Sequence, residues 1–482
     1  MLINKIKEKE IFIAVIILII WLIALWLRTG KIPAPIGDVV YYSEGAYWLL
    51  ERGQLTRFMY PDVLGSNIRQ FLPPVVSFFQ FISFYLFGLN QFSMNFFASF
   101  FVTLLTLVIF LIAIKKKWPI SVAIYSAIAF GCIPTILQYG LRVRNEIYYT
   151  FLLLLTIYIL LYTYRNKYSL LISSFFAGLL IGLSILAYYP MVTALALSGI
   201  LLIYFSYSKE HVYRVFLGFI LGVAVVGFLS ILWIFPDFDL FIKQNTSMGA
   251  AKYSDRQFLD YITSYGAWRN IIIGFVAFLF LKFYALKYKL DQAKACLIIV
   301  IIISLHYIIS PFVEFTSFVL LIVGILLLGN QVFSSNFQKI ILNIFRLMAI
   351  CSLSLMILLV FKSFSPERNY KIFSKEILNN TNLNKIVLSD HAGWLALRPV
   401  LNKDQLIGLR NGVGVAQSIV IDFLLDTNNA SKVSAVVFIK ENEARYSEIY
   451  PLFNELINNA NCNKKKIGLV SPLQVMVLNC IN

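Results

Sequence analysis

Long uninterrupted apolar runs constrain this chain more than any other feature. About eleven segments are long enough to cross the roughly 30 Å hydrocarbon core of a bilayer as helices. Their apolar residues form continuous blocks and do not alternate with polar ones, which predicts spanning helices and not a barrel. The predicted spans are 11–27, 91–114, 119–138, 147–163, 169–187, 190–207, 213–235, 270–287, 295–310, 316–331 and 339–361.

The composition supports a polytopic helical membrane protein. The chain is 59% hydrophobic and only 13% charged, whereas soluble proteins are about 25% charged. Its formal net charge of +17 comes from Lys and Arg that gather in short loops between the apolar runs, which is typical of the positive-inside rule. Because these basic loops lack the interleaved aromatic residues of RNA-binding surfaces, we expect no nucleic-acid partner.

The basic loops also predict the orientation. They alternate onto one side of the predicted spans, which should be cytoplasmic. These loops are the N-terminal MLINKIKEKE, Lys115–Lys117, 165–167, 209–214 and 287–294. The N-terminus is then cytoplasmic, and an odd number of spans places the C-terminus outside. We therefore expect a multi-pass protein of the plasma membrane.

The first outer loop, residues 28–90, carries two further helical segments. The stretches 41–52 and 75–88 are too short to span beside their neighbours and are predicted to lie as amphipathic helices at the interface. If 75–90 were a true span, every later loop would change sides and Lys115–Lys117 would lie outside, so we favour the interfacial reading. A cleaved signal peptide at 11–27 is disfavoured because no A-x-A-like site follows it.

From about residue 362 the charge rises and the apolar runs shorten. Alternating strand and helix patterns predict a small α/β domain. The predicted strands are 386–390, 405–409, 434–439, 466–470 and 474–479, and the predicted helices lie near 393–400, 415–426 and 446–459. We therefore divide the chain into a membrane domain, 1–361, and an extracytoplasmic α/β domain, 362–482.

Two features of the C-terminal domain have more than one reading. Arg410–Gly414 follows a strand like half of a phosphate-binding turn, but it lacks the third glycine, so a plain turn is favoured. Cys462 and Cys480 flank the last two strands. If these strands pair as a hairpin on the oxidising outer side, the two cysteines could form a disulfide.

Asp38 is the leading candidate for a catalytic residue. It lies just past the end of the first span, and an acidic residue at a membrane boundary points to function. The alternative role is an ordinary N-cap of the following helix. Glu146 opens a later span close to Arg142 and Arg144. In one interpretation, the helix dipole simply favours Glu146 at this position. In the other, one of the two arginines binds a substrate phosphate through bidentate hydrogen bonds.

Other charged residues are weaker candidates for binding a phosphate. They are Arg57 and Arg69 in the first outer loop, Lys252, Arg256 and Arg269 in a later one, and His306 near the outer end of a span. A lone helical His is more often a packing residue. The acidic residues are too few and scattered to predict a metal site, so no metal ligands and no cofactor are assigned, and a divalent metal stays an unsupported alternative.

These motifs together resemble the GT-C glycosyltransferases. The pattern Asp38-x3-Tyr42-x-Glu44-x4-Leu49-x3-Gly53 resembles the opening motif of the branch that holds protein O-mannosyltransferases and the aminoarabinose transferase of lipid A. Further resemblances, in order and spacing over about 1–330, are Pro73-Pro74 with Phe87-Gly88, Arg144-Asn145-Glu146, and Leu305-His306-Tyr307-Ile308-Ile309-Ser310-Pro311.

The resemblance implies a polyprenyl-phosphate sugar as donor and transfer with inversion to an acceptor hydroxyl at the outer membrane face. Asp38 would be the general base, and Glu146, in what resembles the family's second acidic loop, would be a further catalytic residue. With the candidates argued from residue chemistry added, the residues predicted to bind the donor or its phosphate are Tyr42, Glu44, Arg57, Arg69, Arg142, Arg144 and His306. The acceptor could be a glycan, a lipid or a protein.

The chain departs from the family pattern at two places. Val39 stands where many relatives carry a second acidic residue, and Tyr188-Tyr189-Pro190 stands where the lipid A branch often carries a lysine. The donor and acceptor therefore stay open. Two other functions remain as alternatives, namely a polymerase or ligase acting on lipid-diphosphate oligosaccharides, and a transporter or flippase, although no internal repeat of the transporter kind is visible.

Overall fold

The structure is a computed structural model. It describes residues 2–31, 38–53, 74–134, 144–162, 169–188, 191–206, 209–239, 241–242, 265–306, 314–364, 370–401, 405–409, 418–470 and 473–480, and at Asp38 it describes the backbone alone. The chain forms two compact units that do not follow chain order. The first contains 1–26, 98–235 and 256–359, and the second contains 27–97, 236–255 and 360–482. The division of the domains at 361/362 stays a prediction.

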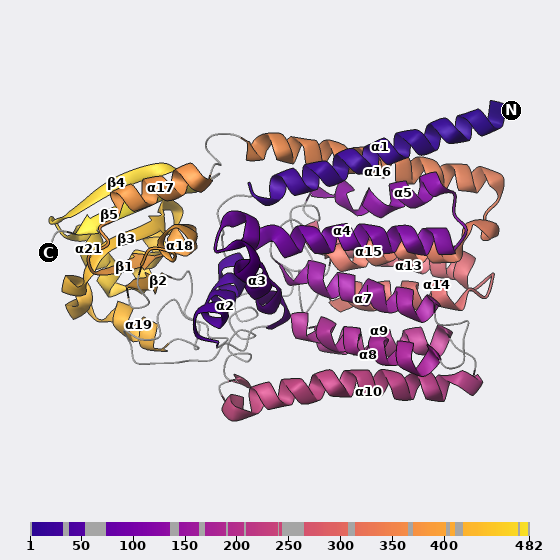
Figure 1. Ribbon diagram of the computed structural model, residues 1–482, viewed down its shortest axis with the longest axis horizontal. Helices are drawn as coiled ribbons and strands as arrows, with labels where there is room; N and C mark the ends of the chain where they lie inside the picture. Colours follow the sequence, from indigo (N-terminus) through magenta and orange to yellow (C-terminus); the bar gives the residue numbers. More distant parts are fainter. Residues whose placement is uncertain are drawn as a thin grey trace. The chain divides into compact units, whose positions relative to one another are not determined.

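The first unit is a bundle of apolar helices that run alternately in opposite directions (Figure 1). Its helices are α1 (Leu2–Thr29), α4 (Gln91–Lys115), α5 (Ile120–Ala129), α7 (Asn145–Tyr162), α8 (Ser169–Ala187), α9 (Val192–Ser206), α10 (Lys209–Ile234), α13 (Tyr265–Phe280), α14 (Asp291–Leu305), α15 (Glu314–Leu328) and α16 (Ser335–Ser363). The short helical turns are η1 (Phe130–Cys132), η4 (Phe235–Asp237), η5 (Leu281–Ala285) and η7 (Asn330–Val332). Every predicted span contains one of these helices.

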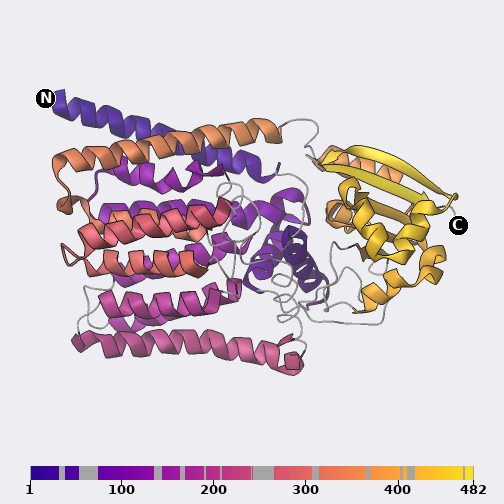
Figure 2. The ribbon, with the colours of Figure 1, turned by 180° about the vertical axis from the view of Figure 1, so that it is seen from behind.

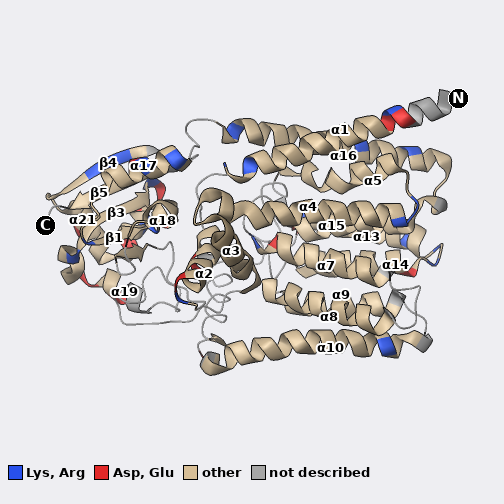
Figure 3. Cartoon of the chain, in the orientation of Figure 1, with Lys and Arg blue, Asp and Glu red and all other residues tan. Residues whose placement is uncertain are grey.

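The lengths of these helices fit a polytopic membrane protein. Among the described residues, 6 helices are long and apolar enough to cross a bilayer, and several others are shorter. Lys and Arg gather at the end of the bundle where α4 finishes and α14 begins, including Lys115–Lys117 and Lys294 (Figure 3). The sides of the helices are largely uncharged, as a hydrocarbon environment requires.

Small residues let α8 and α10 pack with their backbones in close contact. A Cβ atom at Gly178 would lie 2.1 Å from the carbonyl oxygen of Phe219, and one at Gly222 would lie 2.1 Å from that of Phe175. Such close approach is typical of helix pairs in membranes, where van der Waals contact replaces the hydrophobic effect. Buried indole groups add hydrogen bonds: Trp21 Nε1 of α1 donates to the Ser352 hydroxyl of α16 at 2.9 Å, and Trp118 Nε1, between α4 and α5, donates to the carbonyl of Leu326 in α15 at 2.8 Å.

The second unit contains a five-stranded sheet with the order β2-β1-β3-β5-β4 (Figure 2). The strands are β1 (Ile386–Ser389), β2 (Leu406–Gly408), β3 (Val433–Ile439), β4 (Cys462–Val470) and β5 (Leu473–Cys480). β1 is parallel to β2 and β3, whereas β5 is antiparallel to β3 and β4. All five predicted strands are confirmed, and β3 is buried along its whole length.

The helices of this unit are α2 (Asp38–Arg52), α3 (Pro74–Phe87), α17 (Tyr370–Asn380), α18 (His391–Leu397), α19 (Ser418–Leu425), α20 (Glu443–Ile449) and α21 (Pro451–Asn458), with the turns η10 (Thr427–Lys432) and η11 (Lys440–Asn442). The three helices predicted in the C-terminal domain correspond to α18, to α19, and to α20 with α21. The structure confirms that 41–52 and 75–88 are helical. The turn predicted at Arg410–Gly414 lies outside the described residues.

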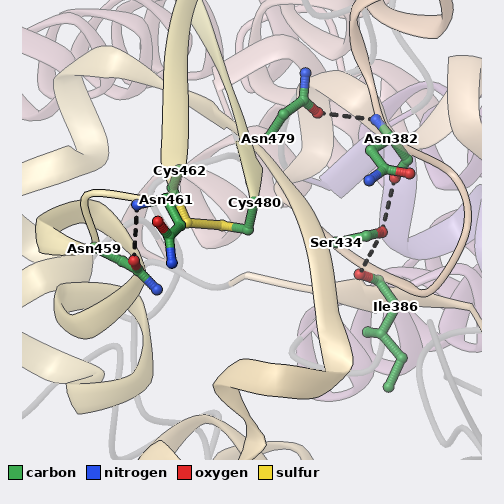
Figure 4. Close-up of a disulfide and its surroundings, with 8 residues drawn as sticks. All are labelled: Asn382, Ile386, Ser434, Asn459, Asn461, Cys462, Asn479 and Cys480. Atoms are coloured by element: carbon green, nitrogen blue, oxygen red, sulfur yellow. Dashed lines mark hydrogen bonds between the residues drawn. A yellow bond between two sulfur atoms is a disulfide. The ribbon is translucent and has the colours of Figure 1, made fainter. Parts of the chain in front are cut away.

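A disulfide closes the hairpin of β4 and β5 (Figure 4). Cys462 and Cys480 are directly opposite each other in the register of the two strands, so the pairing that the sequence left open is present. Nearby, the Asn479 side chain accepts a hydrogen bond from the backbone N–H of Asn382 at 2.8 Å. Ser434 in turn donates to the carbonyl of Asn382 at 2.8 Å, so the segment before β1 is tied to β3 and β5.

Asp390 fixes the position of α18 on the sheet. Its carboxylate accepts hydrogen bonds from the N–H groups of Ala392 at 2.9 Å and of Ile439, the last residue of β3, at 2.6 Å. The first bond is a helix N-cap. Burial raises the pKa of Asp390 to about 6, although these hydrogen bonds oppose the shift.

We expect the sheet to become more stable as the pH falls toward 4. Because the folded pKa of Asp390, about 6, is above its ordinary value of 3.8, this group stabilises the fold below the ordinary pKa, and that contribution is lost as the pH rises through about 6. The shift of about two units corresponds to about 3 kcal/mol. Hydrogen exchange of β1 and β3 in the full-length protein, between about pH 7 and about pH 4.5, should show this gain in the wild type and lose it in Asp390→Asn. An equal pH dependence in both proteins would contradict the assignment.

Candidate active site

Five charged or titratable side chains lie at one end of the helical bundle, and we call them the bundle cluster. They are Arg144 and Glu146 at the start of α7, Arg269 in α13, His306 at the end of α14, and Glu314 at the start of α15. Because consecutive helices run in opposite directions, these ends all meet on the same side of the unit (Figure 1). This side is opposite to the basic end that holds Lys115–Lys117.

Glu146 is buried next to Arg144. The Nε atom of Arg144 lies 3.5 Å from Glu146 Oε1, and Glu146 is only 3% exposed. Glu146 also lies in the first turn of α7, where the helix dipole favours an anion. The predicted neighbourhood of Glu146 and Arg144 is therefore confirmed, whereas Arg142 lies outside the described residues.

An ion pair between Arg269 and Glu314 joins α13 to α15. Both side chains are largely buried. Sequence reasoning considered Arg269 only as a weak loop candidate and missed Glu314. The signal for Glu314 was present, since it is an isolated carboxylate that opens an apolar run in the same way as Glu146.

Hydroxyl groups connect α7 and α15 beside these charges. Thr150 Oγ1 lies 2.6 Å from Thr316 Oγ1, and the Tyr149 hydroxyl is hydrogen-bonded to Thr316 as well. The ring of Tyr149 stacks on Tyr188 with their centroids 5.8 Å apart. Tyr188 belongs to the segment that departs from the family pattern, so an aromatic stack occupies the place where a lysine was expected. His306 is buried at the end of α14.

The second unit holds a different arrangement around α2, which we call the aromatic cluster. It consists of Glu44, Tyr47 and Trp48 from α2 and Trp394 and Arg398 from the α18 region. Trp48 Nε1 donates to Glu44 Oε1 at 3.3 Å. The guanidinium carbon of Arg398 lies 5.4 Å from the ring centroids of both Tyr47 and Trp48. Burial raises the pKa of Tyr47, and the nearby Arg398 opposes that shift.

The burial of α2 differs from the expectation of an amphipathic helix on a surface. Tyr42, Glu44 and Trp48 are all buried, and Glu44 is only 4% exposed. α2 also contacts α3, where Gln80 Nε2 donates to the hydroxyl of Ser43 at 3.0 Å. The indole of Trp48 contacts the buried Glu44 carboxylate, and the local sequence pattern did not reveal this burial.

The predicted site residues are therefore divided between the two units. Asp38 is the first residue of α2, and Tyr42 and Glu44 follow on the same helix. Arg144, Glu146 and His306 belong to the bundle cluster, whereas Arg57 and Arg69 lie outside the described residues. In the part of the chain that the structure describes, no three His, Cys, Asp or Glu side chains are grouped to hold a metal ion.

The family model of dolichyl-phosphate-mannose-protein mannosyltransferases matches residues 72–234. A solved structure of ArnT from Cupriavidus metallidurans, bound to undecaprenyl phosphate, is 12% identical over 96% of this chain and 97% of its own, with a TM-score of 0.60. This chain therefore has the GT-C fold. A search of curated protein sequences found no match.

Other proteins with the GT-C fold are similar over most of this chain. The oligosaccharyltransferase of Archaeoglobus fulgidus is 12% identical over 92% of this chain and 72% of its own, with a TM-score of 0.53. The arabinofuranosyltransferase AftD from Mycobacteria is 11% identical over 97% of this chain, which spans 40% of AftD, with a TM-score of 0.55. The chain therefore resembles the GT-C superfamily in the branch of ArnT and the protein mannosyltransferases.

The ion pair between Arg269 and Glu314 should be strongly coupled. Removing one partner leaves a buried charge, so Arg269→Met or Glu314→Gln should each lower the free energy of unfolding by about 3–5 kcal/mol, and the double variant should recover part of the loss. Denaturant unfolding in detergent micelles measures this cycle. Arg346→Met is the control, because its pair with Glu10 is more exposed and should be worth about 1 kcal/mol or less. Additive losses would contradict the coupling.

Proposed function

We propose that this protein is an integral membrane glycosyltransferase that moves a sugar from a polyprenyl-phosphate donor to an acceptor hydroxyl at the outer membrane face, with inversion. One observation carries the proposal. The likeness to ArnT extends over 96% of this chain, and the ArnT structure holds undecaprenyl phosphate. The match to the dolichyl-phosphate-mannose family over 72–234 supports the same class of donor.

In the proposed orientation the bundle crosses the plasma membrane. The bundle cluster and the C-terminal domain then lie on the outer side. The basic end of the bundle supports this orientation, because Lys and Arg are retained on the cytoplasmic side. The disulfide between Cys462 and Cys480 supports an oxidising compartment for the C-terminal domain.

In the proposed reaction Asp38 is the general base. It takes the proton of the acceptor hydroxyl while that oxygen forms a bond to the anomeric carbon of the sugar. The bond from the anomeric carbon to the phosphate oxygen breaks at the same time, and the polyprenyl phosphate leaves with the electron pair. Single displacement with one base gives inversion. Asp38 begins a buried helix, which provides a defined position for such a base.

Cationic side chains would stabilise the departing phosphate. Arg144 is the described candidate, since a guanidinium matches a phosphate in bidentate geometry. Glu146 is proposed as a further catalytic residue, with Arg144 beside it. The remaining proposed donor-site residues are Tyr42, Glu44, Arg57, Arg69, Arg142 and His306. The proposed partners are the donor lipid, the bilayer and a glycan, lipid or protein acceptor.

Replacing Asp38 should abolish transfer while sparing the fold. Asp38→Asn keeps the size of the side chain but removes the base, so the rate of sugar transfer from a polyprenyl-phosphate sugar should fall about 10²- to 10⁴-fold. The matched control is Glu51→Gln, an exposed carboxylate on the same helix, which should retain wild-type transfer. The purified protein in lipid vesicles with radiolabelled donor gives the rates. Comparable rates for Asp38→Asn and Glu51→Gln would show that Asp38 is not the base.

A further inference from the structure

The C-terminal domain inserts a buried cation beside the helix that begins with Asp38. Arg398 follows α18 and its residue is 0% exposed. Its guanidinium carbon lies 5.4 Å from the ring centroids of Tyr47 and of Trp48, and the Tyr47 hydroxyl is hydrogen-bonded to it. A desolvated cation is attracted to the faces of aromatic rings, so these contacts hold α2 and the α18 region together.

The Arg398 contacts extend to an acidic residue of the family motif. Trp48, which faces Arg398, donates its indole N–H to Glu44 at 3.3 Å. Trp394 adds an edge-on contact to Tyr47, with the ring centroids 6.4 Å apart. One cation from the C-terminal domain therefore contacts two consecutive aromatic residues of α2, and the second of these orients the Glu44 carboxylate.

The α18 region is itself rigidly held, which makes it a suitable support. Asp390 joins the start of α18 to the end of β3 through its two carboxylate oxygens. Gly393 lets α18 lie directly on the sheet, because a Cβ atom there would come within 2.3 Å of Ser389 Oγ. The backbone N–H of Arg398 then donates to the carbonyl of Trp394 at 2.8 Å, so the helical hydrogen bonding extends to Arg398. The backbone that carries the Arg398 side chain is thus anchored to the sheet.

A second support for α2 comes from α3. Gln80 of α3 donates to Ser43 at 3.0 Å and to the carbonyl of Met94 at 3.3 Å. Ser43 and Tyr47 lie on the same face of the helix, because residues four apart differ by only about 40°, whereas Trp48 lies about 140° around the helix from Ser43. α3 and Arg398 therefore both contact α2, at Ser43 and at Tyr47 and Trp48, and Asp38 begins the same helix.

We propose that Arg398 is a positioning residue for transfer, which holds α2, and with it Asp38, in the orientation that the reaction needs. This inference rests on the proposed function. It assigns the C-terminal domain a part in the reaction although that domain supplies no reacting group. Positioning of this kind governs the rate of the chemical step, and a misplacement of about 1 Å can cost about 10²-fold.

The test uses Arg398→Met in the full-length protein, with Arg398→Lys as the conservative variant. Met keeps much of the side-chain length but removes the cation and its hydrogen-bond donors, whereas Lys keeps the charge without the planar guanidinium. Arg445→Met is the matched control, since Arg445 is an exposed arginine on α20 of the same domain. The readouts are hydrogen exchange by mass spectrometry and steady-state transfer from a polyprenyl-phosphate sugar.

The proposal expects three results from Arg398→Met. Exchange should rise in 38–52 while the peptides of β1, β3 and α3 stay protected, kcat should fall about 10- to 100-fold, and KM for the donor should stay within about 3-fold. Arg398→Lys should lie between this variant and the wild type, and Arg445→Met should match the wild type. A purely structural role would instead raise exchange throughout the sheet.

Other outcomes overturn the proposal. Unchanged exchange in 38–52 would show that Arg398 does not hold α2, and raised exchange with unchanged kcat would show that its hold does not serve the reaction. Raised exchange in β1 and β3 as well would assign Arg398 to folding of the domain. The wild-type protein separates the two hypotheses, because absence of transfer by the wild type would refute the proposed function while the exchange data still decide whether Arg398 holds α2.

Discussion

The burial of α2 between α3 and the α18 region is the constraint on which the account of this protein depends. A helix that carries Glu44 inside a protein needs partners for that carboxylate, because an unpaired buried charge is strongly unfavourable. The indole of Trp48 supplies one, and Arg398 lies against the same indole. The C-terminal domain is thereby joined to the N-terminal part of the chain, and residues 27–97 form one compact unit with 360–482.

The helical bundle places its charged and polar side chains differently. Most of its charged side chains lie near the helix ends, and some polar groups between helices form pairs, such as Thr150 with Thr316. Arg269 and Glu314 neutralise each other, as do Arg144 and Glu146. A buried pair of this kind costs desolvation energy and contributes little to stability by itself.

Much of the fold could be predicted from the sequence, because its signals are local. Continuous apolar runs predicted the helices of the bundle, and short β-rich runs predicted β1 to β5 within a few residues. The sequence left the pairing of Cys462 with Cys480 open, and the structure shows them directly opposite each other in the hairpin. The contacts of Glu44 and Arg398 could not be predicted, since they join residues far apart in the chain and Arg398 carries no motif. Glu314 was missed because its partner Arg269 lies on another helix.

Lipid analysis of the native host tests the central claim most directly. Three strains are compared by mass spectrometry: the wild type, a deletion, and a strain whose chromosomal copy carries Asp38→Asn. A transferase that uses a polyprenyl-phosphate sugar predicts that both altered strains accumulate the same polyprenyl-monophosphate sugar, whose mass identifies the donor. Accumulation of a diphosphate-linked oligosaccharide, or a wild-type lipid profile in the Asp38→Asn strain, would contradict the account.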